Sequence, residues 1–154
     1  MNKLPGKHLE FTLFVEPTAK GRPRTRFLKN PIKKGRLAGQ HVMTYTPKKT
    51  QDAEKDIRVL IEDLKINEYF GRDIPIRLEA IFFRSRPKAR KEDLPTQKPD
   101  WDNFGKLLTD ALQGMLYEND SQITTALIRK RYTLRNTEPR IYCRLSIDSI
   151  DDDF

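Results

Sequence analysis

Alternating apolar and polar positions predict four β-strands along the chain. The alternation is clearest near the C-terminus, where Ile141, Cys143, Leu145 and Ile147 are separated by arginine, tyrosine and serine residues. Successive side chains of a strand point to opposite faces, so this pattern places one face of the strand in a core. The expected strands cover residues 9–16, 76–83, 123–135 and 140–148, and a turn at residues 136–139 joins the last two.

Two further segments show the three- and four-residue spacing of apolar positions that is typical of an amphipathic helix. The first helix is expected to begin within residues 46–50. The second is expected to cover residues 102–112 or 102–113, with Gly114 as its stop. The apolar stripes consist of Ala53, Ile57, Leu60, Ile61 and Leu64 in the first helix, and of Phe104, Leu107, Leu108, Ala111, Leu112 and Met115 in the second.

The element order β-α-β-α-β-β predicts an α+β fold in which two helices pack on one face of a mixed four-stranded sheet. A length of 154 residues is enough for one domain with a real core. We therefore expect a single domain at residues 1–148, followed by a short, frayed acidic tail at residues 149–154. Residues 17–45 are expected to form a long connection, which contains no acidic residue.

The composition favours a polyanionic partner. The chain has a formal net charge of +8, and 34% of its residues are charged. On charge alone, a merely basic housekeeping domain is an equal alternative. The single cysteine, Cys143, excludes an internal disulfide and a cysteine-based zinc cluster, and it predicts a cytoplasmic protein. Residues 1–10 lack the apolar core of a signal peptide, and no stretch is long and apolar enough for a membrane span.

Acidic residues gather around the start of the second helix, within this otherwise basic chain. Asp100 and Asp102 flank one residue, Lys106 follows on the same helix face as Asp102, and Asp120 comes after the helix. The helix is about 17 Å long, and the return to Asp120 can span roughly 24 Å, so the three acids can meet. Carboxylate oxygens suit Mg²⁺ and Mn²⁺. Taken singly, the same residues are more often a helix N-cap, a surface ion pair and a turn residue.

Two basic segments accompany the acids. In the first, alternate cations are expected to project to one side like a comb and to contact phosphates. The second leads directly to Asp100. A solvated flexible loop is the alternative for such runs. Phe27 and Tyr45 could stack on bases, although core packing is the more common use of each. The candidate DNA-binding residues are Lys20, Arg22, Arg24 and Arg26 in the first segment and Arg84, Arg86, Lys88 and Arg90 in the second.

Several motifs together resemble the RusA-type Holliday-junction resolvases, and in particular their phage and prophage branch. The resemblance covers nearly the whole chain, and its central part is specific. The matching segments are Lys20-Gly21-Arg22-Pro23-Arg24, Tyr45-Thr46-Pro47, Lys98-Pro99-Asp100-Trp101-Asp102-Asn103, Lys106, Asp110-Ala111-Leu112 and Asn119-Asp120-Ser121-Gln122-Ile123. One departure is Asn119, because the family often has an acid there.

The resemblance implies a homodimeric, Mg²⁺-dependent endonuclease that nicks four-way DNA junctions symmetrically during recombination or repair. By its motifs, the family's essential acids fall on Asp100, Asp102 and Asp120, and its essential lysine on Lys106. The acids would hold one or two Mg²⁺ ions, and Lys106 would neutralise the scissile phosphate or orient the water. The alternatives are an endonuclease for flaps or forks and a non-catalytic nucleic-acid-binding module.

Overall fold

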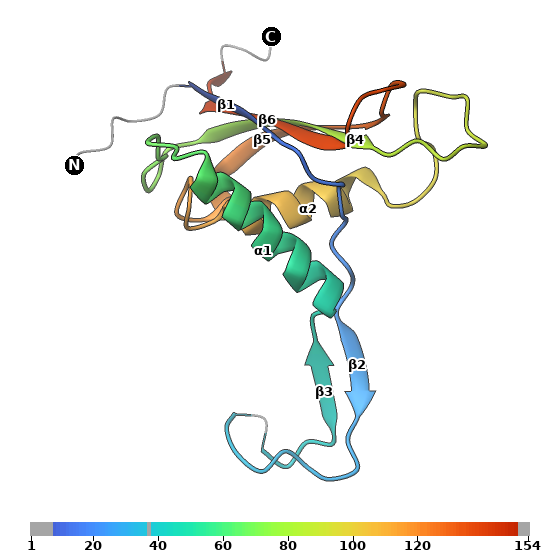
Figure 1. Ribbon diagram of the computed structural model, residues 1–154. Coiled ribbons are helices and arrows are strands. Elements are labelled where there is room, and N and C mark those ends of the chain that lie inside the picture. The colour runs from blue at the N-terminus through green and yellow to red at the C-terminus, as the bar shows by residue number, and fades with distance from the viewer. Residues whose placement is uncertain (1–7, 37, 151–154) are drawn as a thin grey trace.

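A mixed four-stranded sheet forms one layer of the fold, in the order β1-β6-β4-β5 (Figure 1). The computed structural model describes residues 8–36 and 38–150, so the expectations for residues 1–7 and 151–154 lie outside the described residues. β1 is antiparallel to β6, β6 is antiparallel to β4, and β4 is parallel to β5. The strands are β1 (His8–Leu13), β4 (Ile76–Arg84), β5 (Ile123–Tyr132) and β6 (Arg140–Ile147).

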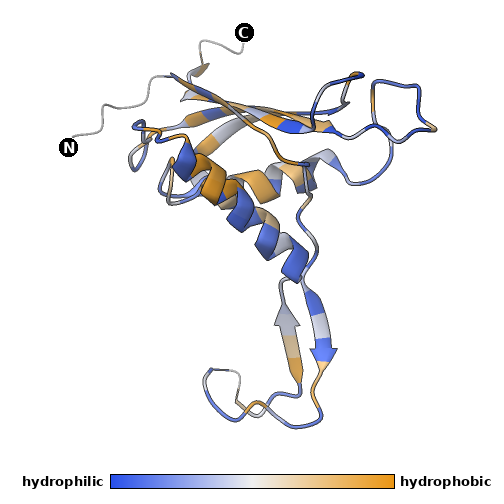
Figure 2. Ribbon diagram, in the orientation of Figure 1, coloured by the Kyte–Doolittle hydropathy of each residue, from blue (hydrophilic) through white to orange (hydrophobic). Residues whose placement is uncertain are grey.

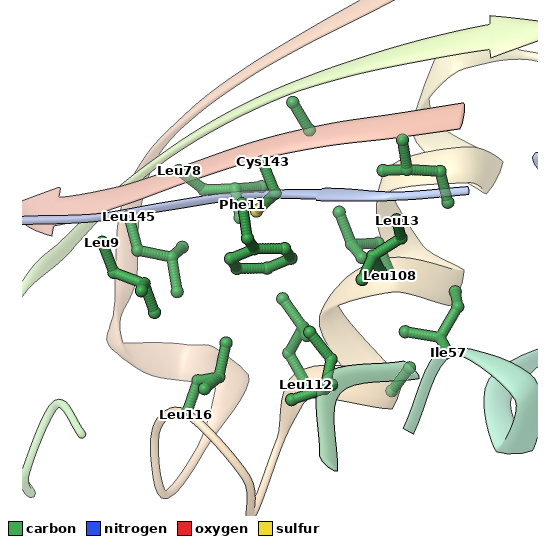
Figure 3. Close-up of a cluster of buried hydrophobic side chains, with 14 of the residues drawn as sticks. Leu9, Phe11, Leu13, Ile57, Leu78, Leu108, Leu112, Leu116, Cys143 and Leu145 are labelled. Carbon is green, nitrogen blue, oxygen red and sulfur yellow. The ribbon is translucent and has the colours of Figure 1, made fainter. Parts of the chain in front are cut away.

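Two helices, α1 (Lys48–Asp63) and α2 (Trp101–Leu112), cover one face of this sheet (Figure 1). The apolar side chains of β1 point toward those of α2, as Figure 3 shows for Phe11 and Leu108. Phe82 of β4 and Phe104 of α2 stack with ring centroids 5.2 Å apart. The predicted α+β class and element order are therefore confirmed. Within the described residues, no helix has the length and apolar character needed to cross a membrane.

The turn after β5 does not make a hairpin, because β4 lies between β5 and β6. β4 is an interior strand, paired with β5 on one edge and with β6 on the other. Helix α2 connects β4 to β5, which is the usual kind of crossover between parallel strands. The acidic motif at the start of α2 therefore lies at the end of the sheet where β4 stops.

The acid-free connection contains a second, two-stranded sheet that the hydrophobic pattern did not predict. β2 (Arg24–Phe27) pairs antiparallel with β3 (Val42–Tyr45), and the hairpin projects away from the body (Figure 1). Figure 2 shows hydrophilic residues along β2 and hydrophobic ones in β3. Phe27 is 85% exposed and Tyr45 is 40% exposed. The core-packing interpretation of these two aromatic residues is therefore wrong.

Helix α1 buries Ile57 and Ile61 as predicted, with Ala53 and Leu60 partly buried beside them. Leu64, which follows the helix, is 44% exposed, so its place in the apolar stripe is a wrong prediction.

The polar side of α1 binds the end of α2 through Arg58. Arg58 donates from Nε to the Ala111 carbonyl and from Nη2 to the Asp110 carbonyl, both at 3.1 Å. It thereby satisfies carbonyls at the end of α2 that have no partner within the helix.

The hydrophobic core between the sheet and the helices stabilises the fold, including α2, which carries Asp100 and Asp102 at its start. Leu108 of α2 is fully buried, so the substitution Leu108→Ala should lower the free energy of unfolding by about 2–5 kcal/mol. Urea denaturation followed by circular dichroism measures this loss. The matched control is Val59→Ala on the exposed side of α1, for which we expect a change within about 0.5 kcal/mol. An equal loss in both variants would contradict this description of the core.

Candidate active site and nucleic-acid interface

The start of α2 presents two carboxylates to solvent. Asp100 is the N-cap residue, with extended backbone angles, but its side chain makes no capping hydrogen bond. Asp102 lies in the first turn, and both side chains are exposed. The apolar residues of α2 face the sheet, so the positions of Asp102 and Lys106 on the opposite face follow from the helical period. Although Asp100 occupies the N-cap position, its carboxylate is therefore not engaged in capping the helix.

Asp120 is returned to α2 by a turn with its own hydrogen bonds. Gly114, at φ +82°, reverses the chain after the helix as predicted. The backbone N–H of Asp120 donates to Oε1 of Gln113 at 3.0 Å. Asn119 accepts from the backbone N–H of Ser121, and Gln122 accepts from that of Asn119, which completes a capping box. Asn119, the departure from the family pattern, thus helps to fix the backbone around Asp120.

Lys106 joins the helix to this turn. Its Nζ lies 2.7 Å from Oδ2 of Asp120 and 2.9 Å from Oδ1 of Asp110. The hydrogen bond to Asp120, and next that to Asp110, raises the pKa of Lys106. The structure therefore brings Lys106 and Asp120 together across the return of the chain. The raised pKa keeps the ammonium of Lys106 charged.

Asp110 is a residue of this site that the sequence analysis did not single out as functional. Burial opposes its ionisation, but hydrogen bonds from Lys20 and Lys106 prevail and lower its pKa. Lys20 also lies 3.5 Å from Oε1 of Glu54 on α1. The available signals were the spacing of Lys106 and Asp110 by four residues, which is common on helix surfaces, and the family-like segment Asp110-Ala111-Leu112. The contact between Lys20 and Asp110 leaves no trace in local sequence.

The donor chemistry at this end of α2 is suited to a hard cation, since Asp100, Asp102 and Asp120 offer only carboxylate oxygens. These three carboxylates do not form a compact cluster. Within residues 8–36 and 38–150, no group of three or more acidic, histidine or cysteine side chains is close enough to hold a metal ion. Asp120 is instead paired with Lys106. Carboxylates at two separate places, the start of α2 and the turn, would therefore have to approach one another around an ion.

A groove of about 810 Å³ brings the first basic segment beside Asp100. The backbone N–H of Lys20 donates to the Asn103 carbonyl at 2.9 Å, which anchors the segment to α2. The backbone N–H of Gly21 donates to Oγ1 of Thr50 at 2.9 Å, and a Cβ at Gly21 would meet the same oxygen. Glycine is required by this close approach. The cations that line the groove are Lys20, Arg22, Arg24, Lys49, Arg84 and Lys98.

Arg26 lies farther out on the hairpin. It is two residues beyond Arg24 on β2, so both side chains leave the same face of the ribbon. Tyr45 and Met43 are their cross-strand partners on that face. Arg24 and Arg26 are therefore alternating cations on one face of an exposed two-stranded ribbon, and Arg22 precedes them in the groove.

The second basic segment, apart from Arg84, lines a separate groove, also of about 810 Å³, between the loop after β4 and the turn before β6. Arg86 is engaged within the protein: its guanidinium donates to the carbonyls of Thr133, Lys91 and Glu92 and pairs with Asp93. Among the residues that the structure describes, no acidic one lines this groove. Its cations are Arg86, Lys88, Arg90, Lys91 and Arg135, and Arg135 was not expected from the sequence.

Trp101 lies between the two acids, as the first residue of α2. It is 58% exposed. It lines a shallow, mostly apolar hollow of about 390 Å³ together with Asp102, Lys106 and Ile128.

Comparison with known proteins agrees with these motifs. The family described as Endodeoxyribonuclease RusA matches residues 15–146. The uncharacterized protein YqaN of Bacillus subtilis (strain 168) is 27% identical over 145 residues, which cover 86% of this chain and 92% of that protein. The matched region begins two residues after β1, ends within β6, and contains the grooves, α2 and Asp120. The chain belongs to the RusA family of endodeoxyribonucleases.

Proposed function

We propose that this protein is a Mg²⁺-dependent endonuclease that resolves four-way DNA junctions by paired, symmetric nicks in recombination and repair. The observation that carries the proposal is that Lys106 meets Asp120 on the helix whose start exposes Asp100 and Asp102, beside a groove lined by cations. Cations suit the polyanionic strand, and the carboxylates suit the metal that hydrolysis needs.

In this proposal, Asp100, Asp102 and Asp120 hold Mg²⁺, for which Mn²⁺ is the natural substitute. The bound cation would lower the pKa of a water molecule and offset the charge that develops on the phosphate. Lys106 places its ammonium beside Asp120, where it neutralises a phosphate oxygen or orients the attacking water. The neighbouring cations hold the strand across the acids.

We assign the DNA contacts to the candidates whose side chains line the grooves or the hairpin face. Arg22, Arg24, Arg26 and Arg84 would follow one DNA strand past Asp100. Lys88 and Arg90 would hold a second segment in the groove beyond β4, where Arg86 supports the loop through its internal hydrogen bonds. Two cationic grooves at the same end of the sheet favour a branched substrate over a single duplex.

Paired nicks in a junction with two-fold symmetry need two active sites, so we propose that the protein acts as a homodimer. Sedimentation equilibrium at micromolar concentration tests this. A mass of twice 18.1 kDa is expected. A monomer, both free and on a junction, would contradict the proposed symmetry.

The deciding experiment is cleavage of a labelled four-way junction, a flap and a linear duplex, each with Mg²⁺ and with EDTA. We expect paired nicks in the junction that require Mg²⁺ and no cutting of the duplex. Cutting of the flap alone would assign the protein to the other branched-DNA endonucleases. Tight junction binding without cleavage in Mg²⁺ or Mn²⁺ would assign it to the non-catalytic DNA-binding proteins.

A further inference from the structure

Five charged side chains of alternating sign form a chain from α1 to the turn that carries Asp120. They come from three separate parts of the sequence. Lys20 lies 3.5 Å from Glu54 and also pairs with Asp110; Lys106 then contacts Asp110 at 2.9 Å and Asp120 at 2.7 Å. In order, the chain is Glu54, Lys20, Asp110, Lys106 and Asp120.

Asp110 is the centre of this chain, and its side chain is only 19% exposed. It gives one oxygen to each lysine: Oδ2 to Lys20 and Oδ1 to Lys106. A partly buried carboxylate with two cations is well compensated, because each charge has a partner of opposite sign. Lys106, by contrast, is 53% exposed, and its stem is flexible. The position of the Lys106 ammonium beside Asp120 therefore depends on its second contact, which is with Asp110.

We propose that Asp110 and Lys20 are positioning residues, which hold the Lys106 ammonium beside Asp120 for cleavage. The proposal rests on the proposed function and extends it to two residues that do not touch the substrate. By occupying Oδ2 of Asp110, Lys20 leaves only Oδ1 to Lys106. Without Lys20, both oxygens of Asp110 attract Lys106 and draw its ammonium away from Asp120. Lys20 then acts through Asp110, in place of the phosphate contact that its position in the basic segment suggests.

The backbone gives this role a second support. The N–H of Lys20 donates to the Asn103 carbonyl, one turn before Lys106, and the next residue, Gly21, donates to Thr50. Lys20 is thus fixed at both its backbone and its side chain, whereas Arg22 and Arg24 continue into the groove and the hairpin. A cation fixed in this way is suited to hold another side chain in place.

The first test compares single-turnover cleavage with junction affinity for Lys20→Met and Asp110→Asn. We expect each variant to cleave a saturating amount of junction between about 10- and 100-fold more slowly, because a small displacement of a catalytic group has effects of this size. The dissociation constant for the junction should stay within twofold of wild type. The double variant should be no slower than Asp110→Asn alone, since both changes act through one residue.

Two further variants sharpen the comparison. Lys20→Arg keeps the charge and should restore most of the rate, while Lys55→Met, on the exposed face of α1, should leave both rate and affinity unchanged. If Lys20→Met weakens junction binding and lowers its salt dependence at an unchanged cleavage rate, Lys20 is a phosphate contact and the proposal is wrong.

The second test needs neither DNA nor metal. The ¹⁵Nζ resonance of Lys106, followed by nuclear magnetic resonance and assigned by its loss in Lys106→Arg, reports the surroundings of the ammonium. We expect Lys20→Met and Asp110→Asn to move it and Lys55→Met to leave it in place. An unmoved resonance in Lys20→Met would refute the positioning role. If wild type cleaves no DNA, the proposed function fails, and this resonance still decides whether Lys20 acts on Lys106.

Discussion

Replacing Asp102 with asparagine should slow junction cleavage by about a thousandfold, because losing some 4 kcal/mol of charge stabilisation at the phosphate corresponds to three factors of ten. Asparagine keeps the size of the side chain at the start of α2 but loses the charge that a divalent cation needs. Asp100→Asn and Asp120→Asn should have effects of similar size. Single-turnover cleavage in Mg²⁺ measures each loss.

Junction binding by these aspartate variants should not fall as their cleavage rate does. Asp100 and Asp102 are exposed beside a cationic groove, so removing either charge removes a repulsion of phosphate, and junction affinity measured in EDTA should persist or increase. Asp63→Asn, at the exposed far end of α1, is the matched control and should cleave at the wild-type rate. Cleavage at the wild-type rate by all three site variants would show that these acids do not carry the chemistry.

Replacing Arg22, Arg24 and Arg26 together with glutamine should weaken junction binding and reduce its dependence on salt. Each phosphate contact contributes about 0.9 to the slope of log affinity against log salt, so the slope should fall by about 2.7. Fluorescence anisotropy between low and physiological salt measures this. Within residues 8–36 and 38–150, these three side chains have no ion pair to lose, so the fold should be unaffected.

The matched control for the three arginines removes the same formal charge elsewhere, at the exposed Lys55, Lys65 and Arg129. Its slope should change little, because charges beyond a Debye length of about 8–10 Å from the DNA are screened. If the slope of log affinity against log salt falls equally in both triple variants, the DNA is attracted by the net charge of the protein and not by the projecting hairpin.

The local hydrophobic pattern was enough to predict a helix or strand wherever that segment has one buried face. The alternation in β6 and the apolar stripe of α2 both follow from the burial of one face, and both elements lie within a few residues of their predicted bounds. The hairpin was missed for the converse reason. All eight residues of β2 and β3 are exposed, so no buried face imposes a hydrophobic period. The threonine, valine and tyrosine residues there were the remaining strand signal.

The sequence by itself determined the α+β class, the two helices and the presence of Asp100, Asp102, Lys106 and Asp120 in the family's order, because these depend on nearby residues. Only the tertiary structure decided that β4 separates β5 from β6 and that Lys20 reaches Asp110. Strand order and ion pairs join residues that are far apart in the chain, and such contacts are chosen by packing of the whole molecule. The same is true of the two grooves, since each forms where separate segments meet.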